Sequence, residues 1–139
     1  MPTLRYVEES EADERVQAAY EEIKAGFGAG QVPNVYKVLG ANPDILEAAV
    51  EHRRRVMDEG TLDPMIKEFL AWASVTLLNN QFGIETHTAR LKRLGYTDAQ
   101  VLEALGVLQY FTGISTVING LAMAQDSNDS VKAFLRGGQ

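Results

Sequence analysis

Helix-start signals recur along the whole chain, and they constrain the fold more than any other feature. Asn42-Pro43 and Asp63-Pro64 each pair a capping side chain with a proline at the first helical position. Thr97 and Gln100 have the spacing of a capping box. No alternation typical of a β-strand rises above noise. The sequence therefore predicts an all-α protein of about six to eight helices.

The expected helices follow these signals. The first should open after Ser10, with Ser-x-x-Asp spacing to Asp13. It should bury one apolar side, formed by Val16, Ala19, Tyr20 and Ile23. Further helices are expected over 34–39 and from 43 to about 59. A long apolar helix should begin at Pro64 and lead to a bend near Asn79-Asn80, and a further helix should then carry His87 to Leu94. The capping box should begin a helix that breaks at Thr112-Gly113 before another over 114–124, and a tail helix is expected around 131–135.

The chain has the length of one domain, and it shows no internal repeat or linker. Its 139 residues are enough to enclose a core of useful size. The apolar share of 45% and the charged share of 23% are those of an ordinary globular protein. One domain spanning 1–139 is therefore expected.

The charge balance excludes some classes of partner. The net charge is −6, which argues against nucleic acid, because phosphate binding needs a basic face. No apolar run reaches the roughly 20 residues that span a bilayer, so no membrane association is expected. The N-terminal stretch has neither the basic nor the apolar region of a secretory signal. A cytoplasmic location is therefore expected.

The chain contains no cysteine and two histidines. Without cysteine it forms no disulfide, no thiolate metal site and no cysteine nucleophile. Two histidines are too few for a histidine-rich metal centre, and Glu85 and His87, two apart on a helix, point in different directions. Neither a metal nor a cofactor is expected.

Glu68 lies in a stretch where nearly every other residue between Pro64 and Leu78 is apolar. A helix that is apolar all round is expected to be central and buried. A carboxyl in such surroundings can act as a proton donor or shuttle near neutral pH. Equally, an acid in a first helical turn can simply interact with the helix dipole or pair with an arginine. Both interpretations stay open on the residues alone.

His87 falls on the apolar stripe of Ile84, Leu91 and Leu94, the spacing of a buried helix face. Extending that stripe backwards places Asn80 and Gly83 on the same side of the helix. A single histidine on such a stripe is often a core residue with its hydrogen bonds satisfied. Gly83 favours another interpretation, because glycine inside a helix costs about 1 kcal/mol against alanine. It indicates either close packing or space left for another molecule.

The stretch from Glu68 to Leu105 resembles the core of the carboxymuconolactone decarboxylase / AhpD-like superfamily. Members have a glutamate early in one helix and then a bend. Redox-active members follow it with Cys-x-x-Cys-x-x-x-His and a basic helix that ends in glycine. Upstream, VPNVYKVLGANPDILEA resembles the peroxidase-related subgroup. The resemblance covers about 32–124 and implies an AhpD-like helical domain.

The resemblance places Glu68 on the family glutamate and His87 on the family histidine, while Asn80 and Gly83 fall on the two cysteines. In redox-active relatives the cysteine pair reduces peroxides, and the glutamate and histidine move protons. Sulfenate and disulfide formation both require thiol sulfur, which this chain lacks. The resemblance therefore implies that the chain keeps the glutamate and histidine that handle protons but has no thiol peroxidase activity.

Decarboxylase members also lack the cysteine pair and act without a cofactor on a lactone acid. This favours a lyase or isomerase acting on a small carbonyl or lactone acid. His87 would be the general acid or base, Glu68 would orient it or relay its proton, and Asn80 would bond a substrate oxygen. Gly83 would leave room for the substrate, and Trp72 and Phe82 would form walls of its pocket.

Two alternatives stay open. The first is a non-catalytic protein on the same scaffold, which holds a small ligand or serves a structural role. A space at Gly83 filled by neighbouring side chains would favour it. The second is peroxidase activity without a thiol, which no residue pattern supports.

The number of apolar helices also bears on assembly. So many nearly all-apolar helices in a small domain leave too little interior to bury them all, so some are expected to face other subunits. The superfamily resemblance implies a homo-oligomer, a trimer or a trimer-based hexamer.

Overall fold

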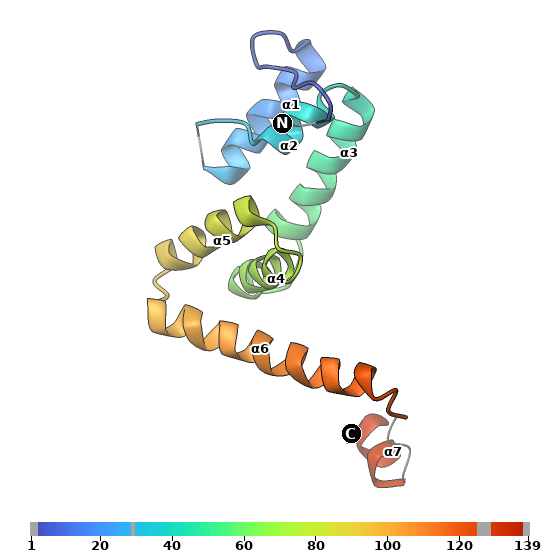
Figure 1. Cartoon of the computed structure of the whole chain (residues 1–139). Helices are drawn as coiled ribbons and strands as arrows, with labels where there is room; N and C mark the ends of the chain where they lie inside the picture. Colours follow the sequence, from blue (N-terminus) through green and yellow to red (C-terminus); the bar gives the residue numbers. More distant parts are fainter. Residues whose placement is uncertain (1–2, 29, 125–128, 138–139) are drawn as a thin grey trace. The chain divides into compact units, whose positions relative to one another are not determined.

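The structure, a computed structural model, describes residues 3–28, 30–124 and 129–137. These residues form seven α-helices and one π-helical segment (Figure 1): α1 (Glu14–Phe27), α2 (Asn34–Leu39), α3 (Pro43–Arg53), η1 (Arg54–Asp58), α4 (Pro64–Leu77), α5 (Gln81–Arg93), α6 (Asp98–Gly120) and α7 (Asp129–Leu135). The predicted all-α class and the expected six to eight helices are confirmed.

The chain divides into two compact units, Met1–Glu68 and Phe69–Gln139. The first unit contains α1, α2, α3, η1 and the first residues of α4. The second unit contains the rest of α4 together with α5, α6 and α7. One domain over the whole chain stays a prediction.

Helix α1 begins three residues later than the Ser10 signal predicts. The Asp13 side chain accepts a hydrogen bond from the Val16 N–H at 2.9 Å, so Asp13 is the N-cap. A carboxylate at this position satisfies one of the N–H groups that a helix start leaves without a partner. Gly28, with φ 62°, ends the helix in the left-handed conformation that glycine adopts most readily.

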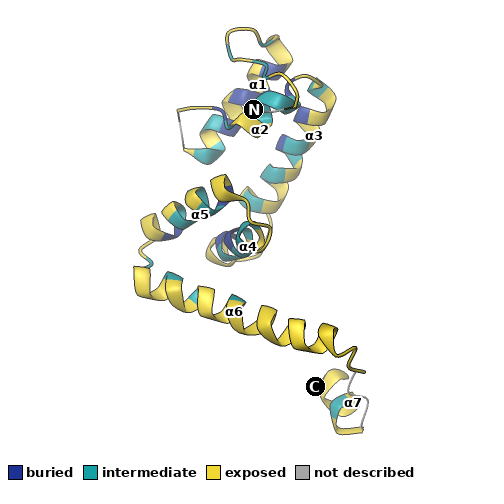
Figure 2. Ribbon diagram, in the orientation of Figure 1, coloured by how far each residue is buried: buried dark blue, intermediate teal, exposed yellow. Residues whose placement is uncertain are grey.

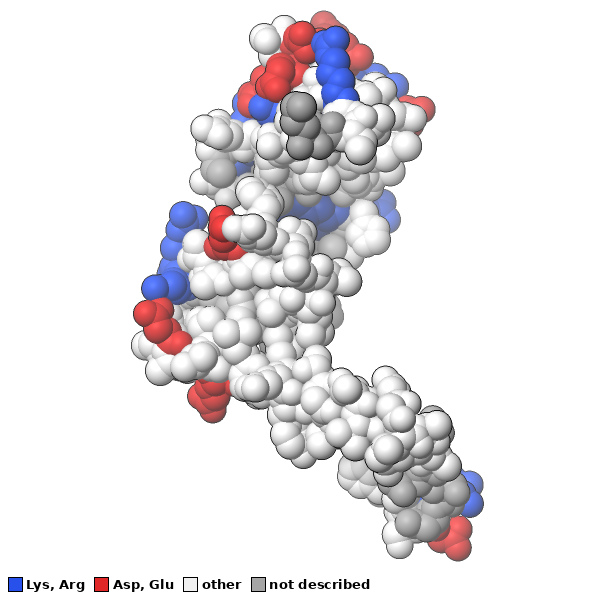
Figure 3. Space-filling model, viewed as in Figure 1, with Lys and Arg blue, Asp and Glu red and all other residues white. Residues whose placement is uncertain are grey.

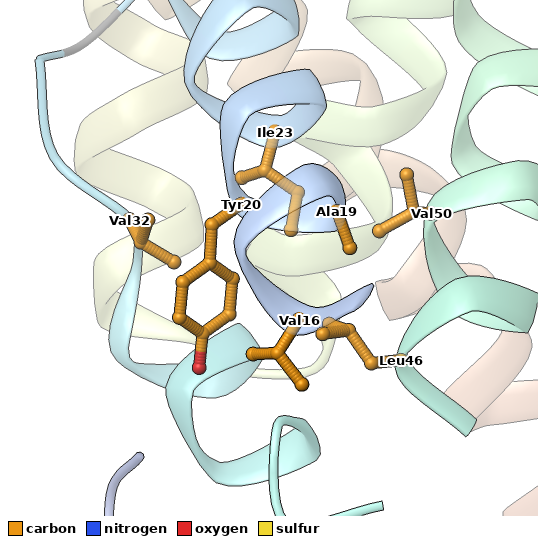
Figure 4. Close-up of a cluster of buried hydrophobic side chains, with 7 residues drawn as sticks. All are labelled: Val16, Ala19, Tyr20, Ile23, Val32, Leu46 and Val50. Carbon is orange, nitrogen blue, oxygen red and sulfur yellow. The ribbon is translucent and has the colours of Figure 1, made fainter. Parts of the chain in front are cut away.

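The core of the first unit lies between α1, α3 and the segment before α2 (Figure 4). Leu46 and Tyr20 are 0% and 1% exposed. The Tyr20 hydroxyl donates a hydrogen bond to the Val7 carbonyl at 2.9 Å, so this large side chain is buried with its polar atom satisfied. The core consists of Val16, Ala19, Tyr20, Ile23, Val32, Leu46 and Val50. The four α1 residues predicted to be buried are all among them.

The helix predicted from Asn42-Pro43 to about Glu59 forms as α3 followed by the π-helical turns of η1. Arg53, at the junction, packs its guanidinium 4.9 Å from the centre of the Phe27 ring and donates to the Gly26 carbonyl at 3.0 Å. It also pairs with Asp58 at 2.9 Å. These contacts fasten the end of α3 to the end of α1.

The second unit follows the predicted local signals closely. Asn79, with φ 54°, makes the bend between α4 and α5. Thr97 and Gln100 form the predicted capping box, with hydrogen bonds of 2.9 and 3.2 Å between each backbone N–H and the other's side-chain oxygen. Gly95, with φ 96°, follows the end of α5 in the left-handed conformation. The predicted tail helix is α7.

The break predicted at Thr112-Gly113 is absent, because α6 runs unbroken from Asp98 to Gly120. The Thr112 hydroxyl donates to the Leu108 carbonyl at 2.8 Å, so its polar group is satisfied within the helix. The cost of one helical glycine, about 1 kcal/mol, is small beside the propagation of a 23-residue helix.

The prediction that α4 is buried all round is wrong for the described chain. Lys67, Glu68 and Trp72 are buried and share one side of the helix, whereas Leu70 and Leu77 are 56% and 57% exposed. Figure 2 shows the same pattern more strongly in α6, which is exposed along nearly its whole length. An apolar sequence identifies a helix that suits burial, but the number of neighbouring elements decides how much of it is covered.

Candidate functional site

Glu68 lies one turn into α4 and is 6% exposed. The start of this helix is set by Asp63, whose side chain accepts from the Met65 N–H at 2.7 Å. The predicted burial of this carboxyl is confirmed. A buried carboxyl retains its hydrogen-bonding and acid/base capacity in surroundings from which most water is excluded.

Lys67, next to Glu68, is a buried residue that sequence analysis missed; it is 8% exposed. Its ammonium group donates to the carbonyl of Glu59, the C-cap residue of η1. A helix end leaves carbonyls without intrahelical partners, and a lysine reaching back satisfies one of them. The signal was present in the sequence as a lysine inside an apolar stretch.

His87 lies on α5 and is half-buried. On its predicted stripe, Leu91 is 0% exposed and Leu94 is 47% exposed, so the buried face covers the middle of the helix and not its end. The Trp72 indole N–H donates to the Thr88 hydroxyl at 3.0 Å, beside His87 in the chain. This bond joins α4 to α5 within the second unit.

Asn80 is the N-cap of α5. Its side-chain oxygen accepts a hydrogen bond from the Gly83 N–H at 3.1 Å. This is the preferred role of asparagine at a helix start. The cap uses the side-chain oxygen of Asn80, whereas a hydrogen bond to a substrate oxygen would use its amide nitrogen.

Gly83 is buried and marks the close approach of α4 and α5. A Cβ atom added there would lie 2.6 Å from Cγ1 and 2.8 Å from Cβ of Val75. The space that sequence analysis assigned to a substrate is therefore filled by Val75. The sequence left close packing and an open space as alternatives, and the structure has close packing.

The two aromatic residues predicted as pocket walls differ in their surroundings. Trp72 is 2% exposed and makes an edge contact with Phe69 at 6.3 Å between ring centres. Phe82 is 56% exposed. The structure thus brings together Trp72 with α5 and Asn80 with Gly83. Glu68 belongs to the first unit and His87 to the second.

A family model matches residues 43–126, which include all of the candidate residues. The chain belongs to the carboxymuconolactone decarboxylase family. This confirms the resemblance that was drawn from the glutamate and histidine positions. Because the match covers both units, it also includes the whole of α4, α5 and α6.

A solved structure extends the comparison to nearly the whole chain. The protein is similar to the alkylhydroperoxidase AhpD core from Rhodospirillum rubrum, with a TM-score of 0.81 and 28% sequence identity. The similarity covers 97% of this chain and 98% of the other. The AhpD-like fold is confirmed. A comparison with curated proteins found no match.

This member of the carboxymuconolactone decarboxylase family has no cysteine. Asn80 and Gly83, which the family resemblance places where redox-active members have cysteines, have structural roles as a helix cap and a packing contact. Within residues 3–28, 30–124 and 129–137, no group of three or more histidine, aspartate or glutamate side chains is placed to hold a metal ion.

An open groove of about 500 Å³ lies between α1 and α3, and none of the candidate residues lines it. It is lined by acidic side chains that include Glu47 and Glu51. Arg15 bonds Glu47 at 2.6 Å and Asp44 at 2.7 Å, and its hydrogen bond lowers the pKa of Glu47 from the ordinary value of 4.5. We interpret this group as a surface ion-pair network.

The contact at Gly83 gives a prediction with a clear sign. Gly83→Ala should destabilise the protein by about 1–3 kcal/mol, because the new methyl group overlaps Val75. In α6, Gly113→Ala meets nothing within 4 Å and should stabilise by up to about 1 kcal/mol through helix propensity. Urea unfolding followed by circular dichroism measures both. Equal effects of the two substitutions would contradict close packing at Gly83.

Proposed function

We propose that this protein is a cofactor-free acid/base enzyme, a lyase or isomerase that acts on a small carbonyl or lactone acid. The observation that carries the proposal is the burial of Glu68, which is 6% exposed. The chain also has a half-buried histidine, His87, where the family resemblance places the family histidine. A carboxyl and an imidazole are the side chains that most often transfer protons in enzymes. The family match over 43–126 supports the same class of chemistry.

In this proposal His87 takes a proton from the carbon next to the substrate carbonyl, or gives one to it. Glu68 orients the imidazole or exchanges a proton with it. The amide nitrogen of Asn80 donates to the oxygen on which negative charge develops. The buried Trp72 and the exposed Phe82 supply apolar surface for the substrate.

The similar solved structure is named an alkylhydroperoxidase, but this chain cannot reduce peroxides through a thiol. A thiol peroxidase forms a sulfenate and then a disulfide, and both steps need sulfur from cysteine. The sequence contains none. Peroxide reduction here would need a different mechanism.

A non-catalytic role is the second candidate, and the packing at Gly83 favours it. Val75 fills the space where a substrate was expected, as in a site that has closed. On this alternative the protein holds a small apolar ligand elsewhere or contributes only its scaffold.

The experiment uses proton exchange, which detects acid/base chemistry before any net reaction. The purified protein is incubated in D₂O with a panel of small lactone acids and oxo acids, and ¹H NMR follows exchange at the carbon next to the carbonyl together with formation of any decarboxylated product. The proposal predicts faster exchange or turnover of at least one compound. Binding of panel compounds without exchange or turnover would overturn it and support the non-catalytic alternative. Consumption of tert-butyl hydroperoxide without exchange would instead indicate a peroxidase.

A further inference from the structure

The Trp72 indole is the polar group through which the α4 part of the second unit reaches α5. Between residues 69 and 77 this helix has no charged residue, so its side chains form no ion pair there. The hydroxyls of Ser74 and Thr76 donate to carbonyls of α4 itself, at 2.7 Å each. The indole N–H of Trp72, a residue only 2% exposed, instead donates to the Thr88 hydroxyl at 3.0 Å. A tryptophan N–H that is buried needs such an acceptor, because little water reaches it.

The charged residues at the end of α5 do not orient this helix on α4. Arg90, Lys92 and Arg93 lie in its last turn, where the helix dipole favours positive charge. Lys92 and Arg93 are exposed, and Figure 3 shows basic side chains on the surface of α5. Lys92 pairs with Asp98 at the start of α6, at 2.8 Å. The orientation of α5 on α4 therefore depends on uncharged contacts.

These contacts occur in opposite order along the two helices, as in a helical hairpin. In order along α4, the contact pairs are Phe69 with Tyr96, Trp72 with Thr88, and Val75 with Gly83. The first and last pairs are apolar, and Gly83 has no side chain that would resist rotation of α5. Apolar attraction has no preferred direction, whereas a hydrogen bond requires a narrow range of distance and angle. The bond at Thr88 is therefore the contact that fixes the rotation of α5 about its axis.

His87 precedes Thr88, so the two side chains leave α5 about 100° apart around the helix axis. When the direction of the Thr88 side chain is fixed, that of His87 is fixed with it. We infer that the Trp72–Thr88 hydrogen bond positions His87, by holding its imidazole in the direction that proton transfer requires. The inference rests on the proposed function, which gives His87 its reaction, but the order of the ring can be measured without a substrate. In this role Trp72 and Thr88 act through His87 and are positioning residues.

Three variants separate the hydrogen bond from the packing around it. Thr88→Val removes the hydroxyl and keeps the branched shape, whereas Thr88→Ser keeps the hydroxyl and removes the methyl group. Trp72→Phe removes the N–H donor and keeps an aromatic ring, so it tests the bond from its other side. Thr116→Val is the matched control, because the Thr116 hydroxyl donates to the Thr112 carbonyl at 2.8 Å within α6. All four variants should retain the helical circular dichroism of the wild type.

The chain suits NMR, because it has one tryptophan and two histidines. Exchange of the Trp72 indole N–H with D₂O should be at least about tenfold faster in Thr88→Val than in the wild type, since the N–H has lost its acceptor. Carbon relaxation of the His87 ring should show increased motion in Thr88→Val and in Trp72→Phe. The ring of His52, exposed on α3, should not change. Thr88→Ser and Thr116→Val should match the wild type in both measurements.

The same variants are then compared in the proton-exchange assay, on a compound that the wild type exchanges. Thr88→Val should lower kcat by about tenfold or more and leave KM within about twofold, because a misdirected imidazole weakens proton transfer more than binding. Thr88→Ser should keep the wild-type kcat. An unchanged His87 ring or an unchanged kcat in Thr88→Val would overturn the inference, and so would equal losses in Thr88→Ser. If the wild type exchanges none of the compounds, the proposed function fails, and the motion of the His87 ring still decides whether the bond positions it.

Discussion

Replacing His87 with alanine is expected to lower the proposed exchange or turnover by about 100-fold or more, the usual contribution of a general acid or base. The expectation follows from the position of His87 on α5, half-buried and next to Thr88, which holds the Trp72 indole. His52, the other histidine, is exposed on α3. His52→Ala should therefore leave the rate unchanged.

Glu68→Gln tests the second member of the pair with little change in shape. Glutamine keeps the size and the hydrogen-bonding capacity of the side chain but cannot exchange a carboxyl proton. A proton relay predicts a loss of about tenfold or more in rate, whereas a purely structural role predicts the wild-type rate. Glu85→Gln, at an exposed position on α5, is the matched control. Wild-type rates for both His87→Ala and Glu68→Gln would exclude the proposed site.

Leu46→Ala is expected to cost about 2–5 kcal/mol in the free energy of unfolding, because it removes a buried side chain and leaves a cavity. Leu46 is 0% exposed and packs from α3 into the cluster formed mainly by α1 (Figure 4). Because a natural domain has only about 5–15 kcal/mol of stability, this loss is a large part of the total.

Leu4→Ala is the control for this substitution. Leu4 is 62% exposed, so the same chemical change should alter stability by less than about 0.5 kcal/mol. Urea unfolding measures both variants. Two separate transitions, of which Leu46→Ala shifts one alone, would show that the two units unfold independently. A small effect of Leu46→Ala would contradict the core assigned to the first unit.

Asn80 and Gly83, at the positions where redox-active relatives have cysteines, both have structural roles in this chain. In the sequence, Asn80 and Gly83 are simply residues that are not cysteine. In the structure, one caps α5 and the other lets Val75 approach within a distance that no Cβ atom would allow. The positions have become part of the helix packing. Placing a cysteine at Gly83 would therefore require a change at Val75 as well.

Local chemistry explains why much of the fold was predictable. Asn42, Asp63 and the Thr97–Gln100 pair act on N–H groups within three residues, so their signals are complete in the sequence. The buried face of α1 was equally clear, because the spacing of Val16, Tyr20 and Ile23 follows the helix period. The predicted break at Thr112-Gly113 was wrong, since a local helix weakness was given more weight than the length of the helix around it.

The sequence by itself determined most helix starts, the family and the absence of thiol chemistry, because each depends on residue type and short spacing. Only the tertiary structure decided that Val75 fills the space at Gly83, that Lys67 is buried against the end of η1, and that α6 leaves apolar side chains such as Val117 exposed. Those three facts depend on which elements meet and how closely. The contacts join residues from different helices or leave a face without a neighbour, and no local pattern specifies them.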